Sequence, residues 1–296
     1  MMYAVMMYQT LMNFLQELLT YWAIFLMHPG AITLRRTSKA LGDNLMLSCL
    51  AREIKRNDPS RYVMVETSWP ELFEHNPNVD TVFSKKVALR YYKNTYTITP
   101  TIHEHTLDQM IRHLPVSISH WERQVDLYYP EEQFAHVLNG LPDRYLVVNP
   151  AGKQTYSANR KEWGVDNFQA LRSRLKHLPF VQIGSADTPL LPQTIDKRGR
   201  PILEDAHLIK HSLTGIFLEG GLMHLANGLN KPSVIIYGGC LHPNISGYAM
   251  HYNIFTTPAC SPCYTSQVPL SPCDTMQCMK IISVDQVIQG IYSIIH

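Results

Sequence analysis

The chain has 296 residues, of which 45% are hydrophobic and 17% are charged, and this composition is typical of a globular protein rather than a disordered or collagen-like one. At roughly 100–200 residues per domain, the length predicts about two domains, and a cleft between two domains is a common place for a ligand site. Lys and Arg number 26 against 24 Asp and Glu, so the formal charge of +2 provides no broad positive field for a nucleic-acid backbone. We therefore expect no nucleic-acid partner.

Residues 1–27 predict an amphipathic helix with one formal charge, Glu17. Its polar residues recur at three- and four-residue steps and leave a broad apolar face. The segment lacks the basic start and the cleavage site of a signal peptide. It exceeds the ~20 residues that a membrane span requires, but its polar stripe argues against full exposure to lipid. We expect a helix that contacts a membrane surface or packs between subunits; a start codon placed too early, with the true beginning near Met27, is the alternative.

The next part of the chain predicts strand, helix and strand in alternation. Strands are expected over residues 31–35, 62–66 and 79–83, and a helix over 44–56. This order indicates a parallel sheet, in which ligands bind beyond the carboxyl ends of the strands. Asp43 lies in the first such loop. The run from residue 85 to 143 contains several histidines without tight metal-ligand spacing, and we assign them no catalytic role.

A second alternating unit begins with a buried strand at residues 145–150. Further helices are predicted over 166–175, 206–210 and 222–229, and further strands over 180–184, 213–218 and 233–237. Gly220 and Gly221 precede a helix, where exposed N–H groups and the helix dipole favour an anion such as phosphate; the alternative is that they only permit a tight turn. Lys161, in the loop after the first strand, is suited to neutralise a diphosphate, and Thr155 and Ser157 offer hydroxyl donors.

Four of the six cysteines lie close together near the carboxyl terminus, as Cys260-x2-Cys263-x9-Cys273-x4-Cys278 within residues 258–279. Four thiolates at this spacing suit a structural zinc or iron ion; free thiols or a disulfide are the alternatives. Because no secretory signal is apparent, a reducing compartment is favoured. Residues 283–295 predict a final helix.

Taken in order, these motifs resemble those of glycosyltransferase family 9, the bacterial ADP-heptose:lipopolysaccharide heptosyltransferases. The resemblance is carried by the segment 37–46 with its Gly42-Asp43 pair, Asn76-Pro77-Asn78-Val79-Asp80, Lys161-Glu162-Trp163, and Gly221-x-x-His224 followed by Pro232 and Gly238. It implies an α/β GT-B fold, in which two Rossmann-like parallel-sheet domains face each other across a cleft. After the helix of residues 1–28, the acceptor-side domain would span 29–144 and the donor domain 145–280, and residues 281–296 would form a helix that packs back on the first domain.

The resemblance also assigns roles to individual residues. Asp43 would be the general base that deprotonates the acceptor hydroxyl, and Lys161, His224 and the amides of Gly220 and Gly221 would stabilise the leaving diphosphate. Asp187 would contact the donor ribose, and Glu219, where many members have Asp, would lie near the sugar hydroxyls. From the residues alone, Asp43 fits a helix-capping aspartate, His224 a buried hydrogen-bonded histidine, and Asp187 a turn residue.

The resemblance implies an inverting glycosyltransferase that moves heptose from ADP-heptose to a lipopolysaccharide core or a related acceptor. It requires no cofactor for transfer and implies a cytoplasmic protein, peripheral at the inner face of the inner membrane. The alternatives are a protein-acceptor heptosyltransferase of the same family, or a non-catalytic GT-B-like nucleotide-binding or assembly protein. A nicotinamide-dependent oxidoreductase is disfavoured, because no Gly-x-Gly-x-x-Gly follows either opening strand.

Overall fold

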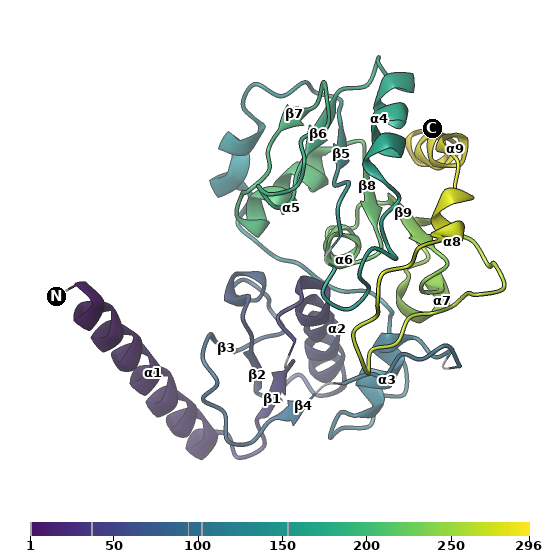
Figure 1. Cartoon of the computed structure of the whole chain (residues 1–296). Coiled ribbons are helices and arrows are strands. Elements are labelled where there is room, and N and C mark those ends of the chain that lie inside the picture. Colours follow the sequence, from purple (N-terminus) through teal and green to yellow (C-terminus); the bar gives the residue numbers. More distant parts are fainter. Residues whose placement is uncertain (1, 37, 94, 102, 153) are drawn as a thin grey trace. The chain divides into compact units, whose positions relative to one another are not determined.

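The computed structural model describes residues 2–36, 38–93, 95–101, 103–152 and 154–296, with side chains from residue 6 onward (Figure 1). Met1 and Thr37, which belong to predicted segments, lie outside the described residues. The chain forms two compact units: the first comprises residues 1–95 and 110–129, and the second 96–109 and 130–296. The segments 96–109 and 130–144, which the sequence analysis assigned to the first domain, thus belong to the second unit.

The first unit contains a parallel four-stranded sheet in the order β3-β2-β1-β4. Its strands are β1 (Ile32–Arg35), β2 (Val63–Glu66), β3 (Thr81–Phe83) and β4 (Tyr92–Lys93), and its helices include α2 (Leu41–Asn57) and the 3-10 turn η1 (Pro70–Leu72). Every residue of β1 and β2 is buried, as expected for parallel strands covered on both faces. The predicted strand, helix and strand order is confirmed.

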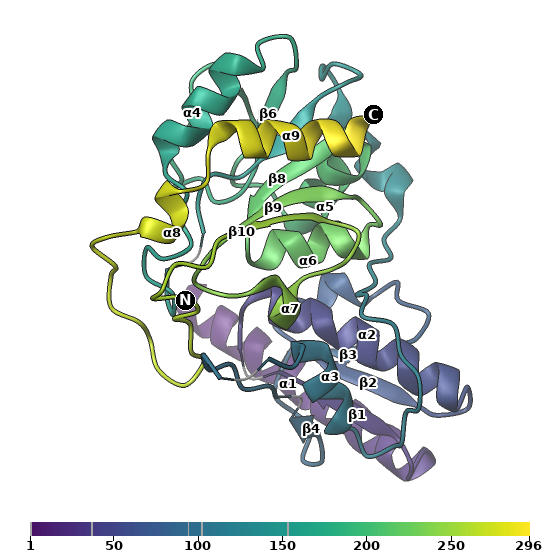
Figure 2. The same ribbon diagram turned by 90° about the vertical axis from the view of Figure 1, so that its right-hand side faces the viewer.

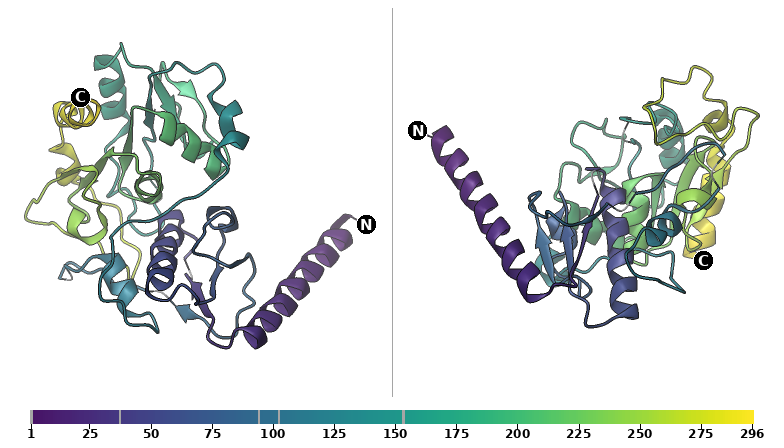
Figure 3. Two further views of the ribbon diagram at one scale, coloured as in Figure 1. Left: turned by 180° about the vertical axis from the view of Figure 1, so that it is seen from behind. Right: turned by 90° about the horizontal axis from the view of Figure 1, so that it is seen from below.

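Helix α1 (Met2–Met27) belongs in part to the core of the first unit. Tyr21 and Ile24 pack with Met64 and Phe83, and the Glu17 carboxylate accepts hydrogen bonds from the Ser84 hydroxyl (2.6 Å) and the Lys85 amide (2.9 Å). The earlier turns extend away from this unit's sheet (Figure 3) and expose a row of large apolar side chains that includes Met6, Met7, Tyr8, Leu11, Met12, Leu15 and Leu19. Within the described residues, no helix combines the length and the apolar character that a membrane crossing requires.

The second unit contains a parallel six-stranded sheet in the order β10-β9-β8-β5-β6-β7. Its strands are β5 (Leu146–Val148), β6 (Phe180–Gln182), β7 (Ile195–Asp196), β8 (Thr214–Leu218), β9 (Ser233–Gly238) and β10 (Tyr252–Phe255). The helices of the rest of the chain are α3 (Thr106–Arg112), η2 (Glu131–Leu138), α4 (Val165–Arg174), α5 (Ile202–His211), α6 (Gly221–Gly228), α7 (Pro243–Ser246), α8 (Gln277–Lys280) and α9 (Val284–Ile295).

Helices cover both faces of the six-stranded sheet. Helices α4 and α9 contact each other, as do α5 and α6, and the two pairs lie on opposite faces (Figures 1 and 2). Val287 and Ile291 of α9 are buried in the core of this unit against Val234 and Ile254. The resemblance implied a final helix that packs on the first domain, whereas these contacts of α9 are with the sheet of its own unit.

Candidate functional site

The strand order of the second sheet reverses at β5, which has β6 on one side and β8 on the other. Open parallel sheets bind ligands beyond the carboxyl ends of the strands at such a reversal. The register pairs Val148 with Ile216, so β5 and β8 end at the same edge. The loop after β5 carries Lys161 and the residue after β8 is Glu219. The topology therefore brings two predicted site residues together, although 58 residues separate them in the chain.

Lys161 and Glu219 form an ion pair, in which Lys161 Nζ donates to Glu219 Oε2. The side chains are only 16% and 6% exposed, and the ammonium lies 4.7 Å from the centre of the Tyr264 ring. The Ser246 hydroxyl donates to Glu219 Oε1 at 3.2 Å. Burial alone lowers the pKa of Lys161, but the charge and the hydrogen bond of Glu219, together with Tyr264 and Cys240, raise it by more, so the pKa is raised overall. The ammonium is therefore charged at neutral pH.

The glycine turn after Glu219 leads directly into α6. Gly220 has φ +153°, a backbone conformation that glycine adopts more readily than other residues, and a Cβ placed there would meet no described atom within 4 Å. The backbone of Gly220 is therefore open on the side where a side chain would project. His224 is buried, with Nδ1 2.6 Å from the Tyr248 hydroxyl, as the alternative of a buried hydrogen-bonded histidine predicts.

The three other predicted donor-site residues lie in neighbouring loops. Thr155 and Ser157 precede Lys161 in the loop after β5; Thr155 is exposed and Ser157 is buried. Asp187 is exposed in the loop after β6, where its amide donates to Ser185 Oγ at 3.4 Å. Because β6 pairs with β5 in parallel, this loop follows the same edge of the sheet. Among the described residues, no hydrogen bond or ion pair joins Thr155 or Asp187 to Lys161.

Asp43 lies in the first turn of α2, whereas the sequence analysis placed it in the preceding loop, before a helix expected from residue 44. The N-cap residue is Ala40, not Asp43, and the start of the helix is fastened by Asn44 Nδ2, which donates to the Ser38 carbonyl at 3.0 Å. Arg36 Nη2 donates to Asp43 Oδ2 at 3.2 Å, and both side chains are largely buried. The sequence analysis did not identify Arg36; its position directly after β1 was the available signal.

The cysteine-rich segment, residues 258–279, lies beside the carboxyl ends of the strands of the second sheet. Cys240, which follows β9, accepts a hydrogen bond from the Cys263 amide through its carbonyl (3.2 Å). The Cys240 thiol and the Arg160 guanidinium, 3.3 Å from Cys263 Sγ, lower the pKa of the Cys263 thiol. Cys273 lies by Asn159, whose Oδ1 accepts from its amide at 2.8 Å. Among the described residues, Cys260, Cys263, Cys273 and Cys278 do not gather with all Sγ atoms within 4.8 Å of one another.

The cysteine thiols therefore have the right chemistry for a bound metal, but their sulfur atoms are not gathered closely enough for all four to share one ion. Zinc and iron are bound by cysteine thiolates, and the lowered pKa of Cys263 favours its thiolate. Cys240, which the sequence analysis did not include in the cluster, is the thiol closely associated with Cys263.

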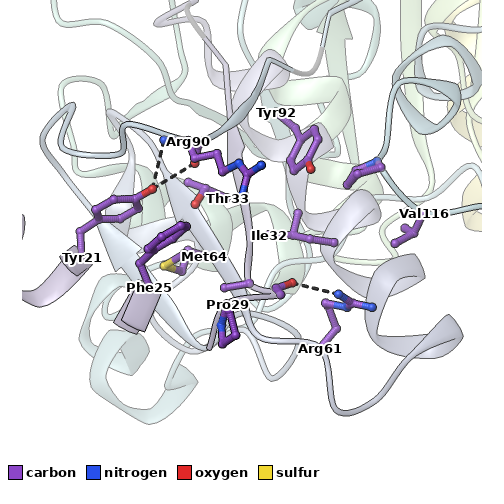
Figure 4. A pocket seen from close by; sticks show the side chains of 13 residues that line it. Tyr21, Phe25, Pro29, Ile32, Thr33, Arg61, Met64, Arg90, Tyr92 and Val116 are labelled. Atoms are coloured by element: carbon purple, nitrogen blue, oxygen red, sulfur yellow. Dashed lines mark hydrogen bonds between the residues drawn. The ribbon is translucent and has the colours of Figure 1, made fainter. Parts of the chain in front are cut away.

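A pocket of about 240 Å³ lies in the first unit, near the amino ends of β1 and β2 (Figure 4). Tyr21 and Phe25 of α1 contribute to its lining. The Tyr21 hydroxyl accepts from the Arg90 amide at 3.1 Å, and Arg61 Nη1 donates to the Gly30 carbonyl at 3.0 Å. Asp43 follows the carboxyl end of β1, whereas this pocket lies near the amino ends of the strands. We therefore assign the pocket no part in the candidate site.

Asp205 of α5 gives the second unit a predicted pH dependence. Its side chain is buried, and its Oδ1 has no hydrogen-bond partner among the described residues. Burial raises the pKa of this carboxyl to about 8, against a smaller lowering by Arg200. An acid with a raised pKa binds its proton more tightly in the folded than in the unfolded state, where the pKa is about 3.9. The free energy of unfolding should therefore fall as pH rises from about 4 to about 8.

In the wild type, the raised pKa of Asp205 is expected to lower the free energy of unfolding by up to about 4 kcal/mol between pH 5 and pH 8, at about 1.4 kcal/mol per pH unit. Asp205→Asn should remove most of that decline, because an amide does not ionise. Urea unfolding at both pH values measures it, with the exposed Asp187→Asn as the matched control. An equal decline in wild type and Asp205→Asn would contradict the prediction.

Comparison with known proteins finds similarity in structure alone. No protein-family model matches the chain, and no curated protein sequence matches it significantly. The chain is similar to E. coli ADP-heptose lps heptosyltransferase II, with 16% identity, a TM-score of 0.66, and 89% of this chain and 98% of that chain covered. It is similar to the glycosyl transferase family 9 protein of Veillonella parvula, with 14% identity, a TM-score of 0.66, and 90% and 97% covered.

A third similar structure is the iron-containing dodecameric glycosyltransferase TibC from enterotoxigenic E. coli, with 16% identity and a TM-score of 0.69. The match covers 89% of this chain and 76% of that chain. At these identities the matches show the fold: two parallel sheets in an α/β chain, as in GT-B-like heptosyltransferase structures. The resemblance drawn from the sequence motifs is confirmed at the level of the fold.

Proposed function

We propose that this chain is a glycosyltransferase that transfers a sugar from a nucleotide-diphosphate donor. The observation that carries the proposal is the Lys161–Glu219 pair beside the glycine turn of α6, at the reversal point of the second sheet. A charged ammonium, free helix amides and open space are the features that a diphosphate needs. The similar structures are glycosyltransferases by name, and one TibC structure was solved in complex with ADP-D-beta-D-heptose.

In the proposed reaction, the Asp43 carboxylate takes the proton of an acceptor hydroxyl, and the acceptor oxygen attacks the anomeric carbon of the donor. The bond between that carbon and the diphosphate oxygen breaks, the configuration inverts, and a nucleoside diphosphate leaves. Lys161 and the amides of Gly220 and Gly221 stabilise the charge that develops on the leaving group. These groups supply the required positive charge, so the proposal includes no divalent metal in transfer.

The remaining candidate residues complete the proposed donor site. Thr155 and Ser157 offer hydroxyls to the phosphates from the loop that carries Lys161, and Asp187 is proposed to bind the ribose. His224 supports the diphosphate from the buried side of α6. Glu219 holds Lys161 before the donor binds and then accepts hydrogen bonds from sugar hydroxyls.

For the substrates, we propose heptose from ADP-heptose as the donor sugar and a lipopolysaccharide core or related glycan as the acceptor. A protein acceptor is the alternative. The exposed apolar side of α1 supports a peripheral location at the cytoplasmic face of the inner membrane, where a glycolipid acceptor is available. We also propose a structural zinc or iron ion at the cysteine-rich segment, in line with the iron-containing description of TibC.

Thermal unfolding with added nucleotides tests the donor site. We expect one of ADP, UDP, GDP and CDP to raise the melting temperature, because a ligand at about 100 times its Kd adds about 2.7 kcal/mol to the stability of the folded state. NAD serves as the control. The matching activated sugars then identify the donor through nucleotide release with an acceptor present. If no diphosphate changes the melting temperature, a non-catalytic assembly protein becomes the better explanation.

A further inference from the structure

Two histidines and a glutamate of the second unit come together where α5 and η2 pack against each other. His207 and His211 belong to α5, and Glu131 is the first residue of η2. Helix α5 ends shortly before β8 begins. Its last turn therefore lies toward the amino ends of the strands, away from the edge that carries Lys161 and Glu219.

The donor atoms of these three residues are close enough to share one ion. His207 and His211 are four residues apart, which places both on one side of the helix, and their ring centres are 4.4 Å apart. His211 Nε2 lies 3.8 Å from Glu131 Oε2, and one donor atom from each residue lies within 4.8 Å of the other two. Two ligands of a tetrahedral ion stand about 3.4 Å apart when each bond is about 2.1 Å long. A small rotation of the exposed His211 side chain therefore brings the set to coordination distance.

The charges around this position act in both directions: the Glu131 carboxylate and the end of α5 favour a cation, whereas the Lys210 ammonium opposes one. Glu131 Oε1 is paired with the Lys210 ammonium, which leaves Oε2 on the side of His211. His211 is the last residue of α5, and the carboxyl end of a helix carries partial negative charge. His207 is only 3% exposed and lies beside the Phe134 ring, so its imidazole is held in place by packing.

We propose that Glu131, His207 and His211 bind a divalent transition-metal ion, with Zn²⁺ as the best chemical match. Two imidazole nitrogens and one carboxylate oxygen form a zinc ligand set that leaves a fourth position for water. Mg²⁺ and Ca²⁺ prefer sets made of oxygen, and the imidazoles select against them. The ion would join η2 to α5, which are distant in the chain, and the site is independent of the proposed sugar transfer.

The test uses the full-length chain without a histidine tag, treated with a chelator and titrated with Co²⁺ as a spectroscopic substitute for zinc. Nitrogen and oxygen ligation gives visible bands alone, whereas thiolate ligation adds a strong near-ultraviolet band, so the cysteine segment is distinguished from this site. We expect Glu131→Gln and His211→Ala to weaken the thiolate-free binding at least ~10-fold, since even outer-shell partners are worth about 10–100-fold.

Both positions lie at the surface or partly exposed, so these variants should fold, and circular dichroism confirms it. His136→Ala, an exposed histidine of η2, is the matched control and should leave binding unchanged. Lys210→Met keeps all three ligands and removes the competing ammonium, so it should tighten binding. Equal Co²⁺ affinity in wild type, Glu131→Gln and His211→Ala, or a spectrum with thiolate ligation alone, overturns the proposal.

Discussion

Replacing Lys161 by methionine is expected to lower the rate of sugar transfer about 10²–10³-fold, the cost of removing one positioned group that stabilises charge in the transition state. The same change should destabilise the fold by about 3–5 kcal/mol, because Glu219 would keep a buried negative charge without its cationic partner. Urea unfolding and nucleotide release measure the two effects. Lys176→Met, at an exposed position, is the control and should change neither.

A double variant separates stability from catalysis at this site. In Lys161→Met/Glu219→Gln no buried charge is left, so most of the stability should return while transfer stays slow. Recovery of transfer in the double variant would show that Lys161 acts on the fold alone and has no role toward the donor.

Asp43→Asn is expected to lower the transfer rate about 10²–10⁴-fold, the range that a positioned general base contributes. The amide has the shape of the carboxylate but does not accept the proton. The change also removes the negative charge of the largely buried ion pair with Arg36, so it should cost about 3 kcal/mol of stability, the lower end for a broken buried pair, because the oxygen of the new amide can still accept a hydrogen bond. Initial-rate kinetics and urea unfolding test the two expectations.

Nucleotide binding provides the control for the same variant. The proposed donor residues are in the second unit, so the rise in melting temperature with the matching diphosphate should be the same in Asp43→Asn as in wild type. If Asp43→Asn transfers sugar at the wild-type rate, Asp43 is not the general base and its contact with Arg36 has a structural role.

The sequence predicted the strands that are buried on both faces, because their apolar runs are continuous. It missed β7 and β10, the two edge strands of the second sheet, and β4, an edge strand of the first. All three contain partly buried or exposed residues, such as Ile195, Tyr252 and Tyr92. Short edge strands depend on pairing with a neighbour, which a local pattern does not contain.

The candidate site was predicted as separate residues and not as contacts. Lys161 and Glu219 were both selected, yet their ion pair depends on the pairing of β5 with β8. Cys240 was not included in the cysteine cluster, because it is brought to Cys263 by the position of β9 rather than by sequence spacing. His207 and His211 have helical spacing, but the third proposed ligand, Glu131, lies in a segment whose sequence shows no clear helix or strand pattern.

Helix α1 links two properties of the first unit that are usually separate. Its residues Tyr21 and Ile24 complete the core over Met64 and Phe83, while the same helix displays a row of exposed apolar side chains. A molecule that binds these exposed side chains therefore binds helix α1, and α1 must pack on the first unit for the core of that unit to be complete. By mass action, such binding would shift the folding equilibrium of the whole unit, so the resistance of this chain to unfolding would depend on what it is associated with.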